Sequence, residues 1–149
     1  MKKGFTIIEM LIVVTIIAVL AGLILRGMGG ALPKSRDAKR MGDLKNVQNM
    51  LEMYYNTSNP STYPSATTWS DLEKQLQSVL GNKIKLPQDP SGGTNTYYYC
   101  PDAAADANGT ITGYILGAQL EVTSSTDSIT GVTCNGKTCG QNLFYCVGM

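Results

Sequence analysis

The chain has 149 residues, 15% of them charged, and it contains no histidine. That length accommodates one modest domain in addition to a long apolar segment at the N-terminal end. The formal net charge of +1 gives no electrostatic reason for the whole chain to bind nucleic acid. Without histidine, most acid–base, triad and metal-site hypotheses fall away, so we expect no enzymatic activity, no cofactor and no metal.

The apolar segment runs from Phe5 to Leu25 and is 21 residues long. As a helix it would span a bilayer core of roughly 30 Å. Lys2 and Lys3 precede it and favour an orientation with the N-terminus inside the cell. Glu9 is the anomaly, because a carboxylate in such a segment costs about 2.5–3.5 kcal/mol on insertion scales. We expect this carboxylate to be unsatisfied within one copy and paired with a positive charge of the next copy.

The segment has two alternative interpretations. One is a secretory signal peptide cleaved near Val19-Leu20-Ala21, although the run is longer than an ordinary signal core and contains Glu9. The other is a plain signal anchor, which explains the orientation but gives Glu9 no role. A lipoprotein is excluded because no cysteine follows the run.

The stretch Lys3-Gly4-Phe5-Thr6-Ile7-Ile8-Glu9 resembles the class III signal of type IV pilins and of type II secretion pseudopilins. Members of that superfamily are cut after the glycine by a membrane peptidase and then methylated on the new N-terminus. The resemblance implies cleavage after Gly4 and N-methylation of Phe5. It also implies that the Glu9 carboxylate pairs with the Phe5 amine of a neighbouring subunit during assembly.

The same resemblance implies the partners and the location of the chain. Its partners would be the prepilin peptidase and methyltransferase, the pilus assembly platform, membrane lipid before assembly, and further copies in a helical filament. The chain would lie in the inner (cytoplasmic) membrane as a single-pass prepilin and would then enter an extracellular filament, or fimbrium.

After the apolar segment, three glycines and Pro33 should weaken or break the helix, at roughly 1 kcal/mol per glycine and 3 for proline. Pro33 can also open a new helical stretch. Apolar residues then recur every three or four positions and predict an amphipathic helix over 34–55. The apolar stripe comprises Ala38, Met41, Leu44, Val47, Met50, Leu51, Tyr54 and Tyr55. The charged residues Lys34, Arg36, Asp37, Lys39, Arg40, Asp43, Lys45 and Glu52 are expected on the opposite, solvated face.

Charge is distributed unevenly along the chain. Residues 5–85 contain nine basic and six acidic residues, whereas residues 86–149 contain one basic and five acidic residues. Either a basic shaft attracts the acidic head of another copy, or the charges are simply solvated.

The remaining elements form the head. Ser70-Asp71-Leu72-Glu73 fits a capping box and predicts a short helix that ends at Gly81. Strand-like segments follow at 96–100, 110–122, 129–134 and 143–147. Residues 35–45, 51–56, 63–64, 86–90 and 97–99 are again similar to pilins and pseudopilins, so the likeness covers about residues 1–100.

All four cysteines, Cys100, Cys134, Cys139 and Cys146, lie in the last third of the chain. An even number in an exported domain predicts two disulfides with three connectivities open, rather than a zinc site. Asn135-Gly136 predicts a tight turn. Among the three connectivities we favour Cys134–Cys139 across that turn with Cys100–Cys146 across the sheet.

The predicted fold class is α+β, with a long N-terminal helix packed on a small C-terminal antiparallel β-sheet, as in type IV pilins. The predicted divisions are a leader at 1–4, a transmembrane and polymerisation helix at 5–30, and a globular head at 31–149. The head would include the amphipathic helix 34–55 and the β-sheet 96–149.

Two weaker patterns occur in the head. Asp102, Asp106 and Asn108 are oxygen ligands in a loop, and some pseudopilins bind calcium in a head loop. The residues do not follow the EF-hand pattern, so a solvated loop is favoured. Asn56-Thr57-Ser58 and Asn108-Gly109-Thr110 fit a glycosylation triplet, which is common by chance in such a composition.

We therefore expect a structural subunit of a type IV pilus that polymerises through its apolar helix. One alternative is the major pseudopilin of a type II secretion system. Another is a membrane-anchored binding module for adhesion or DNA uptake, in which the head would bind its ligand saturably. The cysteine-containing tail favours the pilus subunit.

Overall fold

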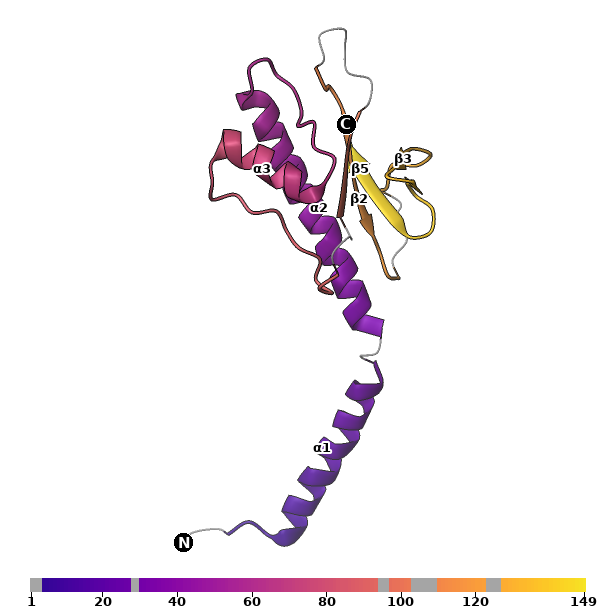
Figure 1. The fold of residues 1–149 in the computed structure, drawn as a ribbon. Helices are drawn as coiled ribbons and strands as arrows, with labels where there is room; N and C mark the ends of the chain where they lie inside the picture. The colour runs from indigo at the N-terminus through magenta and orange to yellow at the C-terminus, as the bar shows by residue number, and fades with distance from the viewer. Residues whose placement is uncertain (1–3, 28–29, 94–96, 103–109, 123–126) are drawn as a thin grey trace. The chain divides into compact units, whose positions relative to one another are not determined.

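The computed structural model describes residues 4–27, 30–93, 97–102, 110–122 and 127–149 (Figure 1). The chain forms two compact units, Met1–Pro33 and Lys34–Met149. The described elements confirm an α+β fold with a long N-terminal apolar helix and a small antiparallel sheet.

The first unit contains helix α1, Ile7–Gly27, drawn in indigo in Figure 1. Its window Ile7–Ile24 has the length and apolar composition of a membrane span, and none of that window is buried inside the protein. Ile7, Ile12 and Leu23 are each more than half exposed. An apolar helix in this state gains free energy when lipid or another chain covers it.

Helix α2, Ala31–Thr57, includes the whole of the range 34–55 predicted as an amphipathic helix. Helix α1 ends at Gly27, so the break falls at the predicted glycine cluster, with residues 28 and 29 outside the described part. Leu44, Val47 and Leu51 are fully buried, and the stripe is confirmed apart from the exposed Ala38. The half-buried members of the stripe are Met41, Met50, Tyr54 and Tyr55.

Helix α3, Trp69–Leu80, confirms the predicted short helix. The predicted cap at Ser70 is wrong, because the chain is still extended at Thr68, whose side chain accepts a hydrogen bond from the Asp71 amide at 3.1 Å. Ser70 already lies within the first turn. The helix ends before Gly81, as predicted, and the φ of +111° at this residue favours glycine.

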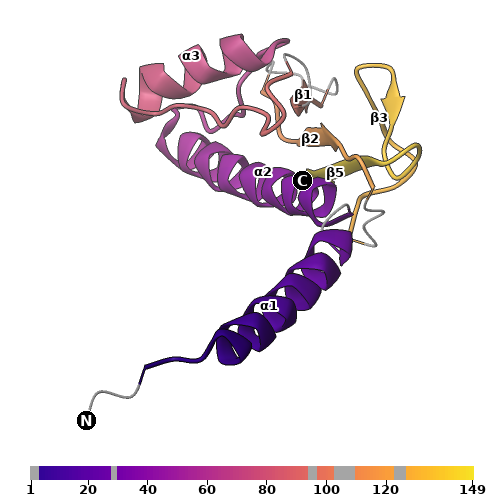
Figure 2. The same cartoon turned by 90° about the horizontal axis from the view of Figure 1, so that it is seen from below.

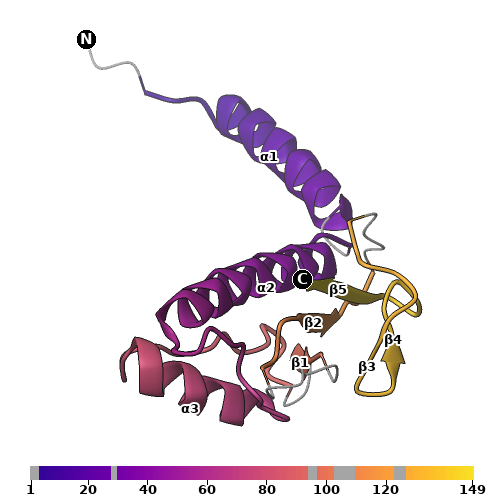
Figure 3. The same cartoon turned by 90° about the horizontal axis from the view of Figure 1, so that it is seen from above.

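The main sheet has three antiparallel strands in the order β1-β2-β5. They are β1 (Tyr97–Pro101), β2 (Tyr114–Gln119) and β5 (Phe144–Gly148). A hairpin of β3 (Thr133–Cys134) and β4 (Lys137–Thr138) forms a second small sheet. Helix α2 and this hairpin lie on different sides of the main sheet (Figures 1 and 3).

The buried side chains of the main sheet form two clusters, one on each face, because successive side chains along a strand point to opposite faces. The face toward the helices carries Tyr97, Tyr99, Tyr114, Leu116, Ala118 and Tyr145, which pack with α2 and α3. The other face carries Tyr98, Cys100, Ile115, Phe144 and Cys146, which pack against Cys134, Cys139 and Ile129. Figure 2 shows α2 along the sheet and the β3 hairpin beyond it.

Two of the predicted strands are shorter than expected. Strand β2 ends at Gln119. The Leu120 amide still donates to the Leu143 carbonyl at 2.9 Å, in register with β5, but the Glu121 amide donates to the Asp37 carboxylate at 2.9 Å instead of to the sheet. The predicted strand 129–134 is reduced to Thr133–Cys134. The tight turn at Asn135-Gly136 is confirmed by φ values of +52° and +79°.

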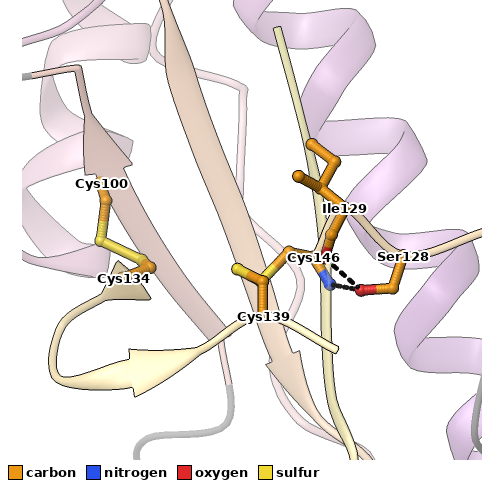
Figure 4. The surroundings of a disulfide bond; sticks show 6 residues. All are labelled: Cys100, Ser128, Ile129, Cys134, Cys139 and Cys146. Atoms are coloured by element: carbon orange, nitrogen blue, oxygen red, sulfur yellow. Dashed lines mark hydrogen bonds between the residues drawn. A yellow bond between two sulfur atoms is a disulfide. The ribbon is translucent and has the colours of Figure 1, made fainter. Parts of the chain in front are cut away.

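The prediction that all four cysteines form disulfides is confirmed, but the favoured pairing is wrong. The bonds join Cys100 to Cys134 and Cys139 to Cys146 (Figure 4). The tight turn places Lys137 opposite Cys134, so Cys139 does not face it. Strand β2 lies between β1 and β5, so Cys100 and Cys146 are separated by two strand spacings, about 9.6 Å. That separation exceeds the reach of a disulfide.

Candidate functional site

The candidate assembly site consists of the residues that lead into α1. Gly4, Phe5 and Thr6 precede the helix in non-helical conformation. A Cβ built on Gly4 meets nothing within 4 Å, and Phe5 is 75% exposed. The Gly4–Phe5 peptide bond, which the sequence predicts as the cleavage point, therefore lies in an open segment outside the helix.

Glu9 forms a capping box with Thr6. Its Oε2 atom accepts a hydrogen bond from the Thr6 amide at 2.9 Å and another from the Thr6 hydroxyl at 2.8 Å. The Glu9 amide donates back to the Thr6 hydroxyl at 3.3 Å. Amides at a helix start lack partners within the helix, and this reciprocal arrangement satisfies two of the donors there.

This geometry corrects the expectation that the Glu9 carboxylate is unsatisfied within one copy. It already has two donors from Thr6, and both hydrogen bonds go to the same oxygen, Oε2. Thr6 is thus a site residue that the sequence reasoning did not single out. Its signal was present as Thr6-x-x-Glu9 at the start of an apolar helix, the spacing that a capping box requires.

A second cluster ties the head together around Arg40. The guanidinium is 2% exposed and contacts three carboxylates, of Asp89 at 2.7 Å, Asp37 at 2.8 Å and Glu121 at 2.8 Å. Arg36 reaches Glu121 as well, with its Nε 2.8 Å from Oε1. These contacts join α2 to the loop before β1 and to the end of β2.

The electrostatics of this cluster follow from its geometry. Hydrogen bonds from Arg40 hold the pKa of the Asp89 carboxyl far below its ordinary value, and bonds from Ser91 add to the effect. Hydrogen bonds from Arg36 and then Arg40 lower the pKa of Glu121 to about 2. Asp37 also accepts the Glu121 and Val122 amides, both at 2.9 Å. Asp89 and Glu121 therefore stay ionised at neutral pH.

This cluster corrects the placement of Asp37 and Arg40 on a solvated face, since both are buried. A buried arginine is tolerated because carboxylates from three segments surround it. It also bears on the uneven charge of the chain. Two of the basic residues of α2 are engaged with acidic residues of the C-terminal half of the same copy.

A third polar group lies inside the aromatic core. The hydroxyls of Tyr63 and Tyr114 donate to the Glu52 carboxylate at 3.1 and 3.0 Å. Burial, followed by this carboxylate, raises the pKa of Tyr63 to about 12. Both tyrosines are nearly fully buried, so these rings serve the core rather than an exposed adhesive surface.

A hollow of about 420 Å³ lies beside α3, lined in part by Trp69, Glu73, Asp89 and Tyr97. Its carboxylates are already engaged. Glu73 accepts the Leu86 amide at 2.9 Å, and Asp89 is bound to Arg40. The ring nitrogen of Trp69 donates to the Pro87 carbonyl at 3.1 Å. These three polar groups of the lining thus serve the fold rather than a ligand.

The weaker predicted sites fall partly outside the described residues. Asp106 and Asn108, of the predicted calcium loop and the second glycosylation triplet, lie in the undescribed stretch 103–109, while Asp102 is described. In the described ranges no group of three or more acidic or cysteine residues could hold a metal ion. The side-chain amide of Asn56 donates to the Glu52 carbonyl at 2.8 Å near the end of α2.

Comparison with known proteins shows the following similarities. Residues 1–25 match the family described as the prokaryotic N-terminal methylation motif. The chain is 30% identical over 123 residues to type II secretion system core protein G of Vibrio cholerae, covering 78% of this chain and 81% of that protein. It is 31% identical over 128 residues to type II secretion system core protein G of Pseudomonas aeruginosa, covering 78% and 84%.

The chain is also 30% identical over 108 residues to the type IV wide pilus major component PilA4 of Thermus thermophilus, covering 67% of this chain and 82% of that protein. No solved structure matches the chain significantly. Each alignment is far longer than the 25 residues of the N-terminal motif, so the similarity extends into the head.

Proposed function

The chain belongs to the superfamily of type IV pilins and type II secretion pseudopilins, and on that premise we propose that it is the structural subunit of a type IV pilus. Members of this superfamily are structural proteins rather than enzymes. The observation that carries the proposal is the apolar helix α1, which no other described part of the chain covers. The exposed Gly4–Phe5 peptide bond precedes this helix, and Glu9 lies in its first turn. Such a helix is stable in lipid or against other copies of itself.

We propose that a peptidase removes residues 1–4 and that Phe5 is then N-methylated. Cleavage creates an α-amino group four residues before Glu9. Thr6 holds Oε2 of this carboxylate, so in our proposal the amine of a neighbouring copy approaches Oε1. Opposite charges brought together away from water attract strongly, so the pair would stabilise the filament and fix the stagger between subunits.

The location follows from the same proposal. The uncleaved chain is a single-pass protein of the inner membrane, and the assembled form is an extracellular filament. The two disulfides support an extracellular location, because disulfides persist in oxidising surroundings.

Mass spectrometry and electron microscopy test this function together. We expect surface filaments that shear from the cells, contain this chain as their main protein and carry N-methyl-Phe5 at its N-terminus. An N-terminus near Gly22 would instead identify a cleaved signal peptide and overturn the proposal.

The second candidate is the major pseudopilin of a type II secretion system. The similarity to core protein G, which covers most of the length of those relatives, favours this candidate. The two candidates differ in what loss of the gene removes. Deletion should abolish surface filaments if the chain is a pilin. It should leave other surface filaments intact and stop export of secreted enzymes if the chain is a pseudopilin.

A further inference from the structure

One end of the head is built from three segments that are distant in the sequence. Arg36 of α2 meets Glu121 after β2, with Nε and Oε1 2.8 Å apart. The Leu120 amide donates to the Leu143 carbonyl at 2.9 Å. We call this region, comprising residues 34–39, 119–122 and 141–143, the basal end of the head.

The basal end carries two exposed apolar side chains, Val122 at 51% and Leu143 at 37% exposure. Leu143 is the second central residue of a turn closed by a 2.8 Å bond from the Phe144 amide to the Gln141 carbonyl. Its φ of +60° lies in the left-handed region, where asparagine or glycine is easier to accommodate than leucine. The turn itself therefore gives no reason for a leucine at this position.

The basal end also carries unneutralised positive charge. Arg36 and Arg40 are occupied by carboxylates. Lys34 and Lys39, in contrast, are exposed, and among the described residues neither forms an ion pair. Lys137 adds a further ammonium group, whose Nζ donates to the neutral Gln119 side chain at 2.9 Å. Apolar side chains beside free lysines suit the boundary between lipid headgroups and acyl chains.

The covalent chain keeps this surface close to a membrane. Only nine residues, 25–33, separate Ile24 at the end of the membrane-length window from Lys34. Even a fully extended connection of that length reaches no more than about 35 Å. A tether of this kind gives the basal end a high effective concentration at the bilayer, so weak contacts are enough to hold it there.

We propose that, before assembly, the basal end of the head docks on the lipid headgroups of the membrane that anchors α1. Val122 and Leu143 enter the headgroup region, and Lys34 and Lys39 contact lipid phosphates. The inference rests on the membrane anchoring in the proposed function. A bilayer is favoured over a second copy because the tether guarantees its proximity and because its phosphates complement the free lysines. Release of this contact is then a step in extracting the subunit into a filament.

The test uses the full chain in nanodiscs made of equal parts phosphatidylglycerol and phosphatidylcholine, with a gadolinium-labelled lipid. Amide signals of Glu121, Val122 and Leu143 should broaden at least threefold more than that of Ser58, which directly follows α2 and lies about 33 Å along the helix axis from Arg36. We call this ratio of amide broadening, basal end to Ser58, the contrast. The paired substitution Val122→Thr with Leu143→Asn should reduce the contrast by at least half. Asparagine suits the φ of this turn and threonine keeps the β-branched shape, so the variant should fold.

Matched variants separate the possible causes. Met53→Gln removes an exposed apolar side chain far from the basal end and should leave the contrast unchanged. The paired substitution Lys34→Gln with Lys39→Gln should remove the dependence of the contrast on the phosphatidylglycerol fraction of the disc. A contrast that persists in the Val122/Leu143 variant overturns the docking proposal. So does broadening that requires two chains per disc, which would indicate a contact between copies. A chain that fails to enter nanodiscs would instead contradict the membrane anchoring itself.

Discussion

Arg40 and Asp89 lie 49 residues apart in the sequence and meet in the core of the head through contacts of 2.7 and 3.1 Å. The pair fastens the loop before β1 to α2, and Asp37 fastens the end of β2 to the same helix turn. The side chains of Arg40 and Asp89 are 2% and 1% exposed. Breaking one partner of such a buried pair leaves an uncompensated charge in the interior.

We therefore expect Arg40→Met to destabilise the head by about 3–5 kcal/mol, because Asp37 and Asp89 lose their buried counterion. Denaturant unfolding of the full chain in an uncharged detergent, followed by Trp69 fluorescence, measures this change. The matched control is Arg36→Met, whose pair with Glu121 is about one-third exposed and should contribute about 1 kcal/mol or less. Equal losses for the two variants would refute a special role for Arg40.

The same cluster predicts a pH dependence of stability. Arg36 and Arg40 lower the pKa of Glu121 from 4.5 to about 2, and Arg40 lowers that of Asp89. A carboxyl whose pKa is lower in the folded chain stabilises the fold above its unfolded pKa and loses that contribution as the pH falls. The urea midpoint should thus decrease from about pH 4.5 down to pH 2. Arg40→Met should flatten this decrease, and an equally steep profile in that variant would contradict the assignment.

Glu9→Gln should reduce filament yield strongly while membrane insertion remains intact, because the amide keeps the size of the side chain but removes its charge. Thr6→Val should have a smaller effect, because the Thr6 amide still donates to Glu9 while the hydroxyl bond is lost. Sheared filaments and membrane fractions quantified by immunoblotting provide both readouts. Wild-type filament yield from Glu9→Gln would show that charge at this position is dispensable.

Peptide mapping without reduction should recover Cys100 linked to Cys134 and Cys139 linked to Cys146. The paired substitution Cys139→Ser with Cys146→Ser should lower the free energy of unfolding by about 2–4 kcal/mol. Reducing agent should then produce a smaller further loss in this variant than in the wild type. Recovery of a Cys134–Cys139 peptide would contradict the register of the β3–β4 hairpin.

Gly117→Ala should destabilise the head by about 1–3 kcal/mol, the usual effect of overpacking. A Cβ at this position would lie 2.4 Å from the ring of Phe144, which covers the glycine from the neighbouring strand. Gly42→Ala is the control, because Gly42 lies on the exposed face of α2 and a Cβ there meets nothing within 4 Å. This substitution should stabilise the helix by about 0.5–1 kcal/mol. Thermal unfolding of both variants distinguishes the two effects.

Local features of the sequence determined the family, the apolar helix, the amphipathic stripe and the end of α3 at Gly81. These features depend on residues within a few positions of one another, such as the three- and four-residue spacing of Leu44, Val47 and Leu51. The spacing of Gly4, Phe5 and Glu9 likewise predicted the N-terminal methylation motif that residues 1–25 match. Thr6 was readable in the same way, as the first residue of a capping box.

Only the tertiary structure decided the disulfide pairing and the partners of Arg40 and Asp37. Periodicity assigned these two charges to a solvated face, since a charge is normally buried only when partners surround it. Those partners, Asp89 and Glu121, arrive from segments whose position depends on the strand order β1-β2-β5. The same order separates Cys100 from Cys146. Contacts between distant segments depend on how the whole sheet is assembled, so spacing along the chain did not specify them.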